Sequence, residues 1–263
     1  MNLGLQNKRV IVTASSKGLG KATALQFAME GAKILLSSRN EEELKTTAEE
    51  IKAMSNNQEV HYVVCDVTKE DDITRLFETA SALLGGVDIL VNNAGGPSPG
   101  GFSQVTDEDW YTAFEKNLLS YIRTIRLALP YMKEQNFGRI VNISSSSTKE
   151  VLDGLILSNT FRLGMVGLSK SIAREYAVNN ILINTVGPGR IQTDRITELD
   201  QIAAVKKNVS INEIQAGNKQ MIPAGRYGEP AEFANIIAFL CSEANTYMTG
   251  QNLVVDGGML KAL

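Results

Sequence analysis

The sequence predicts an α/β fold, with a single doubly wound parallel sheet of seven strands and helices on both faces. Two observations lead to this prediction. Short runs rich in β-branched residues alternate with stretches of helical period along the whole chain of 263 residues. The β-branched runs are also almost continuously apolar, which is typical of parallel strands that are buried on both faces.

The expected elements alternate in order along the chain. Seven strands are expected at residues 8–14, 32–38, 60–65, 87–93, 138–144, 181–186 and 252–257. Helical stretches between them include residues 20–30, 41–54, 71–84, 107–135 and about 157–178. Neither a long linker nor an internal repeat interrupts the alternation, so we expect one domain over residues 1–263. An insertion at about 194–225 breaks the rhythm, and its length predicts a mobile, partly helical flap over a site.

Composition narrows the range of functions. The net charge of −3 and the pI of about 5.4 disfavour nucleic acid or an anionic membrane as a partner. Cys65 and Cys241 lie in apolar contexts, which indicates reduced thiols and a cytoplasmic location. The single histidine, His61, lies in a strand-like run, so a Ser-His-Asp hydrolase or a histidine metal site is not expected. The carboxylate clusters lack the spacing of metal ligands, and we expect no bound metal.

A glycine-containing loop follows the first expected strand and opens a helix. Gly18 and Gly20 would let the backbone approach a pyrophosphate, and the helix N-terminus would present free N–H groups to the phosphates. An ordinary strand-to-helix turn is the alternative interpretation. The cofactor contacts expected from this loop are Thr13, Ser15, Ser16, Lys17, Gly18, Leu19 and Gly20.

The end of the second expected strand indicates the type of dinucleotide. An acidic residue there would hold a ribose 2′-hydroxyl and repel a 2′-phosphate. The chain instead has Ser38 and Arg39, with no carboxylate before Glu41. Arg39 can pair with a phosphate and Lys17 could approach it from the first loop, which favours NADP(H) over NAD(H). The alternative is that both are solvated surface cations.

Further motifs lie in order along the chain. Cys65-Asp66-Val67 follows the third expected strand, Asn92-Asn93-Ala94-Gly95 follows the fourth, and Asn117 lies in the run EKNLLS. Ser145 ends the run NISS, and the segments 188–193 and 249–258 complete the series. With the first loop, these motifs resemble those of the short-chain dehydrogenase/reductase family, of the 3-oxoacyl-[acyl-carrier-protein] reductase-like type. The resemblance covers essentially the whole chain.

The resemblance implies a Rossmann-like fold, a small-molecule substrate and a homo-oligomer, either a tetramer or a dimer. It implies that Asn117 and Ser145 are catalytic. The cofactor contacts that it adds to the first loop, Ser38 and Arg39 are Asp66, Val67, Asn93, Ala94, Gly95, Arg162, Pro188, Gly189, Ile191 and Thr193.

Two departures from the family pattern carry information. The family has a Tyr-x-x-x-Lys pair thirteen residues after the catalytic serine, where this chain has Ser158 and Arg162. No tyrosine lies between Tyr131 and Tyr176, so a shifted alignment does not restore the pair. The smaller departure is Ala14, at the position of the first glycine of the family's loop.

These substitutions change the expected acid–base chemistry. A tyrosine, with a pKa near ~10, can be tuned into a general acid, whereas a serine hydroxyl is a much weaker acid and an arginine stays charged. Losing the general acid would cost about 10²- to 10⁴-fold in rate, although Arg162 could hold the ribose and stabilise an oxyanion.

Three hypotheses follow. The protein is an NADP(H)-dependent oxidoreductase of a carbonyl or alcohol, such as a 3-oxoacyl compound, that works with Asn117, Ser145, Ser158 and Arg162. Alternatively, it is an NADP(H)-binding pseudoenzyme that acts as a sensor or partner subunit. The third hypothesis is a different reaction in the same pocket, such as C=C reduction or an isomerisation.

Overall fold

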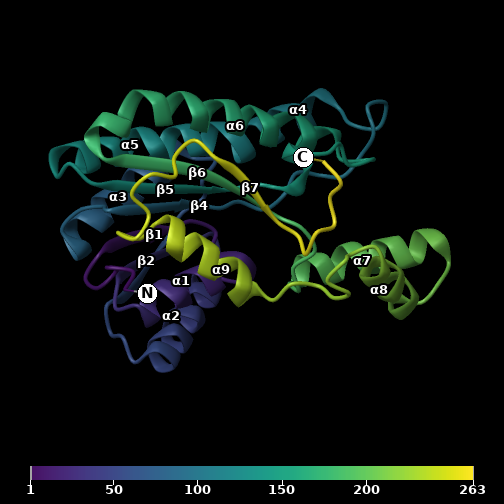
Figure 1. The fold of residues 1–263 in the computed structure, drawn as a ribbon, viewed down its shortest axis with the longest axis horizontal. Helices are drawn as coiled ribbons and strands as arrows, with labels where there is room; N and C mark the ends of the chain where they lie inside the picture. Colours follow the sequence, from purple (N-terminus) through teal and green to yellow (C-terminus); the bar gives the residue numbers. More distant parts are fainter. Residues whose placement is uncertain (1, 263) are drawn as a thin grey trace.

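The computed structural model describes residues 2–262, and one seven-stranded sheet forms its centre (Figure 1). The strands are β1 Arg9–Val12, β2 Lys33–Ser38, β3 Val60–Val64, β4 Ile89–Asn92, β5 Gly138–Ile143, β6 Ile181–Pro188 and β7 Asn252–Val255. They lie in the order β3-β2-β1-β4-β5-β6-β7, and every neighbouring pair is parallel. The predicted sheet is confirmed. Its strand order reverses between β1 and β4, where open α/β sheets form their ligand crevice.

Helices cover both faces of the sheet, as predicted (Figure 1). One face carries α1 Gly18–Met29, α2 Glu41–Ser55 and α9 Pro230–Leu240. The other face carries α3 Glu70–Leu84, α5 Ser120–Glu134 and α6 Ile156–Tyr176, with α4 Asp107–Phe114 packed beside α6. Two short 3₁₀ turns, η2 Ser146–Thr148 and η3 Ala177–Asn179, flank α6.

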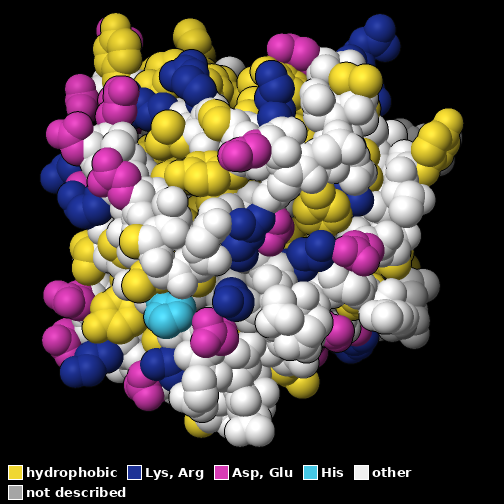
Figure 2. All heavy atoms as spheres, turned by 90° about the vertical axis from the view of Figure 1, so that its left-hand side faces the viewer, with side chains coloured by type: hydrophobic (Ala, Val, Ile, Leu, Met, Phe, Trp, Pro, Cys, Tyr) yellow, Lys and Arg dark blue, Asp and Glu magenta, His cyan; other side chains and the backbone are white. Residues whose placement is uncertain are grey.

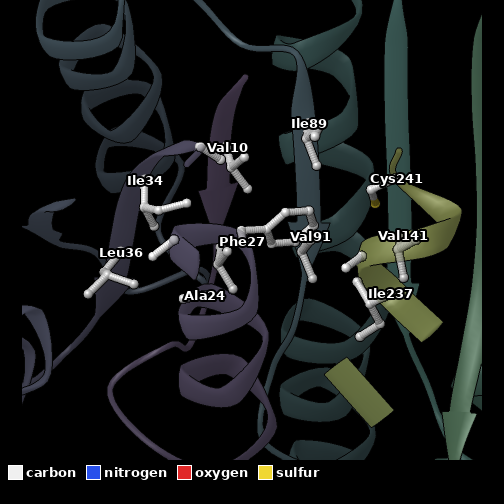
Figure 3. Close-up of a cluster of buried hydrophobic side chains, with 14 of the residues drawn as sticks. Val10, Ala24, Phe27, Ile34, Leu36, Ile89, Val91, Val141, Ile237 and Cys241 are labelled. Carbon is white, nitrogen blue, oxygen red and sulfur yellow. The ribbon is translucent and has the colours of Figure 1, made fainter. Parts of the chain in front are cut away.

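Apolar side chains fill the space between the sheet and each helical layer. Phe27 of α1 and Ile237 of α9 pack among strand residues that include Val10 and Val91, and all four are 0% exposed (Figure 3). Successive strand residues point to opposite faces, so Ile11 belongs to the second layer. Burying each large side chain contributes about 1.5–3 kcal/mol. The unbroken apolar character of the strands therefore has its cause in two buried faces.

The expected helix over residues 107–135 is interrupted, so that prediction is wrong in its middle. A π-helical turn, η1 Glu115–Leu119, separates α4 from α5. Such a turn adds a residue to the helix and is common at functional sites. Asn117 is 0% exposed within the turn, and its side chain bonds the loop after β4. A pattern of helical period does not reveal this contact, because the contact joins two distant segments.

The insertion between β6 and β7 contains two helices, α7 Asp194–Lys207 and α8 Ile211–Gln220. They stand apart from the main body, at the lower right of Figure 1. The buried carboxylate of Asp200 accepts hydrogen bonds from Arg190 Nη1 (2.8 Å), Asn218 Nδ2 (2.9 Å) and Tyr227 Oη (2.7 Å). This network ties α7 to α8 and to the loops on either side. The mobility of the flap stays a prediction.

The distribution of charged and apolar side chains bears on the surface and on the helices. Basic and acidic side chains are interspersed over the face that lies opposite α7 and α8 (Figure 2). Within residues 2–262, no helix has the length and apolar character needed to span a bilayer.

Candidate functional site

The loop between β1 and α1 forms the first wall of the site. Lys17 caps α1, whose first turn holds Gly18 and Gly20 and presents its N–H groups at the positive end of the helix dipole. A Cβ at position 20 would lie 2.4 Å from the Ala14 carbonyl oxygen, so only glycine lets the loop fold this closely. Ala14 itself has a φ of 46°, a left-handed conformation that favours glycine.

The loops after β1 and β4 are hydrogen-bonded to each other. Thr13 Oγ1 donates to the Asn93 carbonyl (2.7 Å) and accepts from the Asn93 amide (2.7 Å). Asn93 Nδ2 donates to the Ala14 carbonyl (3.0 Å). Ser15 is 0% exposed and its hydroxyl bonds Val12 and the amide of Ser37. The side chains of Thr13 and Ser15 therefore shape the loop and have no free donor for a ligand.

The end of β2 holds a polar cluster that includes an unexpected carboxylate. Ser16 Oγ lies 3.1 Å from Ser38 Oγ and donates to Glu43 Oε2 at 3.0 Å. Lys17 Nζ lies 4.0 Å from Glu43 Oε1, and Arg39 is exposed beside the cluster. Glu43 thus accepts from the Ser16 hydroxyl and lies near Lys17, two of the residues that the sequence assigned to the cofactor. Its place in the first turn of α2 is common for an acid, so its sequence position gave no signal of this role.

Asp66 and Val67 lie beyond the end of β3 and are both partly exposed. Asp66 Oδ1 accepts from the amide (3.0 Å) and the hydroxyl (2.8 Å) of Thr68, while its own amide donates to Asp72. These bonds hold the turn after β3 in one conformation. The segment therefore forms a fixed rim on the side of the crevice next to β2.

A buried chain of polar side chains fixes the ends of the central strands. Asn92 Nδ2 donates to Asn142 Oδ1 (2.9 Å) and its Oδ1 accepts from Thr124 Oγ1 (2.7 Å). Asn142 Nδ2 donates in turn to Ser169 Oγ (3.0 Å), which lies 3.0 Å from Thr185 Oγ1. A satisfied polar network of this kind rigidifies its surroundings. The ends of β4, β5 and β6 are thereby held in register with α5 and α6.

Asn117 and Ser145 face the same region from different elements. Asn117 Nδ2 donates to the Gly95 carbonyl (2.9 Å), while its Oδ1 is buried without a partner among residues 2–262. Ser145 Oγ accepts from the Ser147 amide (3.1 Å), a bond that leaves its own proton free to donate. The structure therefore offers one acceptor and one donor at this point.

Ser158 is joined to this region through a residue that the sequence did not single out. Ser158 Oγ lies 3.2 Å from Ser147 Oγ, and the exposed fractions of the two residues are 7% and 6%. Ser147 thus contacts both Ser145 and Ser158. It lies in a run of four serines, and residue type alone does not distinguish it from its neighbours.

Arg162 lies one turn along α6 from Ser158 and is 4% exposed. Its Nη1 donates to the Ile143 carbonyl (2.8 Å) and to Tyr121 Oη (3.2 Å), and its Nη2 lies 3.4 Å from the Ala94 carbonyl. All three acceptors are uncharged. Arg162 Nε is buried and has no partner among residues 2–262. The guanidinium therefore braces the ends of β4 and β5, and Nε is the nitrogen that it leaves without a partner among residues 2–262.

Tyr121 is the tyrosine that contacts Arg162, but it does not replace the missing general acid. It is 2% exposed and its hydroxyl donates to the Ile143 carbonyl at 3.1 Å. Burial raises the pKa of Tyr121, and the charge of Arg162 opposes this change only in part. A hydroxyl that is enclosed and protonated in this way cannot reach a substrate.

The loop after β6 closes the site from the other side. The Gly189 amide donates to the Val255 carbonyl (2.9 Å), which continues the pairing of β6 and β7 past Pro188. Ile191 is 3% exposed, so only its backbone can contact a ligand. Thr193 caps α7, and its Cγ2 lies 3.9 Å from where a Cβ of Gly18 would be. The structure thus brings the loop 188–193 against the first loop.

The described residues contain no group of three or more His, Cys, Asp or Glu side chains that could hold a metal ion. The donors and acceptors of the site belong instead to backbone amides, hydroxyls, amide side chains and cations.

Comparisons with known proteins show the family of the chain. The family model described as "Enoyl-(Acyl carrier protein) reductase" matches residues 13–260. The 3-oxoacyl-[acyl-carrier-protein] reductase FabG of Aquifex aeolicus is 37% identical over 98% of this chain and all of its own length. Dehydrogenase/reductase SDR family member 4 of Oryctolagus cuniculus is 35% identical over 97% of this chain and 94% of its own. The chain belongs to the short-chain dehydrogenase/reductase family.

A solved structure in this family gives the same architecture. The L-sorbose reductase from Gluconobacter frateurii, complexed with NADPH and L-sorbose, superposes with a TM-score of 0.94. It is 32% identical, and the match covers 100% of both chains. In the present short-chain dehydrogenase/reductase, the four residues expected to be catalytic meet at the ends of β4 and β5. Asn117 contacts Gly95 after β4, Arg162 contacts Ile143 at the end of β5, and Ser145 and Ser158 both contact Ser147 just beyond β5.

Proposed function

We propose that the protein is an NADP(H)-dependent oxidoreductase that interconverts a carbonyl and an alcohol. The observation that supports this proposal best is the meeting of three loops at the carboxyl ends of the central strands. The first loop, the β4 loop and the loop 188–193 all meet there, and Asn117 and Ser145 both remain. A 3-oxoacyl thioester is the first substrate class to test, because a relative at 37% identity is a 3-oxoacyl-[acyl-carrier-protein] reductase.

The residues of the crevice fit a dinucleotide. The positive end of α1 and the close loop at Gly20 suit a pyrophosphate. The buried Arg162 Nε and Asn117 Oδ1 provide a donor and an acceptor that no described residue satisfies. Buried polar atoms without partners are rare and call for an explanation. Contacts with the cofactor would supply the missing partners.

Each polar residue then has a separate role. NADPH supplies a hydride to the substrate carbonyl carbon when it is bound. Ser145 donates its free proton in a hydrogen bond to the carbonyl oxygen, and Ser158 holds Ser147 against Ser145. Arg162 holds the cofactor ribose through Nε, and its fixed positive charge stabilises the developing oxyanion. Solvent supplies the proton that completes the alcohol, since neither Ser158 nor Arg162 is an effective acid at neutral pH.

One observation favours a second candidate, an NADP(H)-binding pseudoenzyme. The Arg162 guanidinium contacts three groups of the protein itself, namely Tyr121 Oη and the carbonyls of Ile143 and Ala94. Such contacts are typical of a side chain with a structural role. Such a protein would bind the dinucleotide and signal its presence to a partner.

We also propose that the protein is cytoplasmic and forms a homo-oligomer, a tetramer or a dimer. Tyr111 of α4 is 68% exposed and Leu163 of α6 is 55% exposed, and α4 packs beside α6. Exposed apolar side chains on adjacent helices are typical of an interface between subunits.

The deciding experiment follows NADPH oxidation at 340 nm over a panel of carbonyl compounds that includes acetoacetyl thioesters. The natural protein is compared with Ser145→Ala and with the double variant Ser158→Tyr/Arg162→Lys. Turnover by the natural protein that falls about 10²-fold or more in Ser145→Ala supports the oxidoreductase. Turnover by the double variant alone favours the pseudoenzyme, because the pocket would then bind cofactor and substrate and the natural protein would lack only the proton donor.

A further inference from the structure

Lys116 lies beside Asn117 in the π turn and has no assigned role. Its Nζ lies 3.2 Å, and its Cε 3.5 Å, from where a Cβ of Gly95 would be. The side chain therefore lies along the β4 loop at the edge of the crevice. It also lines a cavity of about 70 Å³ with Gly96 and Asp109. A cavity of this size admits small polar groups but no bulky side chain.

The ammonium of Lys116 is half-buried and has no carboxylate to neutralise it. Within residues 2–262, Lys116 Nζ makes neither a hydrogen bond nor an ion pair within 4.0 Å. Asp109, the acid that shares the cavity, is occupied by its bonds to the amide (2.9 Å) and hydroxyl (2.7 Å) of Thr106. An ammonium that is only partly solvated and has no counter-ion in the chain is available to bind an anion from outside it.

The charges around Lys116 are mostly of the same sign. Burial lowers the pKa of Lys116, and the positive charges of Arg39, Arg162 and Arg195 lower it further. Asp66 is the one acid whose charge acts in the opposite direction. These side chains come from the ends of β2 and β3 and from α6 and α7. Arg195 is paired with Glu198, whereas Lys116, Arg39 and Arg162 form no ion pair within residues 2–262, and cations that lack counter-ions attract an anion.

We propose that Lys116 is a phosphate-binding residue of the dinucleotide site, a proposal that rests on the NADP(H) function proposed above. The ammonium donates to a phosphate oxygen of the cofactor and offsets the repulsion among the surrounding arginines. The phosphate is either the 2′-phosphate or the diphosphate. Lys116 thus adds positive charge to the site from the π turn, next to the catalytic Asn117.

The test measures dinucleotide binding directly, without turnover. The affinities for NADPH and NADH are determined by calorimetry for the natural protein, Lys116→Gln, Lys116→Arg and a control, Lys133→Gln. The control removes the same charge from α5, about 25 Å further along the helix. If Lys116→Gln does not fold, Lys116→Met takes its place, because it keeps the stem that packs beside Gly95.

We expect Lys116→Gln to bind NADPH about 10- to 100-fold more weakly, the loss of one charge-assisted hydrogen bond. The affinity of Lys116→Arg for NADPH should stay within about threefold of that of the natural protein. The affinity of Lys133→Gln should equal that of the natural protein. Weaker binding of NADPH alone would assign the contact to the 2′-phosphate, and an equal loss for NADH would assign it to the diphosphate.

Two results would overturn the proposal about Lys116 and leave the proposed function intact. One is NADPH binding by Lys116→Gln that is as tight as that of the natural protein. The other is a loss of NADPH affinity in Lys133→Gln that equals the loss in Lys116→Gln, because the effect would then come from the net charge of the protein. If the natural protein bound neither dinucleotide, the proposed function itself would fail, and the role of Lys116 with it.

Discussion

Asp200 joins the flap, residues 194–225, to the rest of the protein. Replacing Asp200 with asparagine tests how much it contributes to the free energy of local opening. The carboxylate is 0% exposed and accepts three hydrogen bonds, from Arg190, Asn218 and Tyr227. Asp200→Asn keeps the size of the side chain and removes its charge. Each bond then loses its charge assistance, and the cation of Arg190 loses its counter-ion.

The structure sets the size of the expected effect. A hydrogen bond to a charged group contributes about 1 kcal/mol more than one between neutral groups. Three such bonds give about 3 kcal/mol, which matches the lower end of the cost of breaking a buried ion pair. A change of about 3 kcal/mol multiplies the open fraction of a local equilibrium by about 100-fold. We expect this opening in residues 194–225.

Hydrogen exchange of the backbone amides measures the opening of each segment separately. The amides of α7 and α8 should exchange about 100-fold faster in Asp200→Asn, while those of β1 and β4 stay unchanged. Glu198→Gln is the matched control, because Glu198 lies on α7 and forms only an exposed pair with Arg195 (2.9 Å). Exchange in α7 that is equal to that of the natural protein would refute the idea that Asp200 anchors the flap.

Three further predictions concern the first loop, the cofactor preference and the thiols. Ala14→Gly should raise the free energy of unfolding by about 0.5–1 kcal/mol, because glycine adopts the positive φ without strain; thermal unfolding measures this, and a lower midpoint would contradict it. Glu43→Gln should bind NADPH several-fold more tightly with little change for NADH, because it removes a negative charge beside Ser16; equal gains for both, measured by titration, would contradict this. Burial raises the pKa of Cys65 to about 12 and also raises that of Cys241, so both thiols should resist iodoacetamide at pH 8 until urea unfolds the chain. The unfolded chain loses these protons near pH ~8.5 and the folded chain does not, so stability should fall above about pH 9, as urea midpoints would show.

The sequence was a good guide wherever the information is local. The seven strands follow from runs of β-branched residues, and the loop at Gly18 and Gly20 follows from residues that are adjacent in the chain. The absence of tyrosine and lysine at positions 158 and 162 is also a sequence fact. Each of these features depends on residue type and on short spacings, so one chain was enough to predict it.

The functions of individual side chains were harder to predict. The sequence placed Ser15 among the cofactor contacts, yet its hydroxyl is bound to β2. It could not show that Glu43 takes the hydroxyl of Ser16, or that Ser147 joins Ser145 to Ser158. All of these contacts depend on the orientation of side chains after the backbone has folded.

The sequence by itself determined the fold class and the family, and it predicts that Ser158 stands where the family has its acid. Only the tertiary structure decided how Arg162 is used, since the carbonyls that it contacts belong to the loop after β4 (Ala94) and to β5 (Ile143). It also decided that a π turn carries Asn117 and Lys116 to the β4 loop. The physical reason is that periodicity records which face of an element is buried, whereas hydrogen bonds between distant segments depend on how those elements pack.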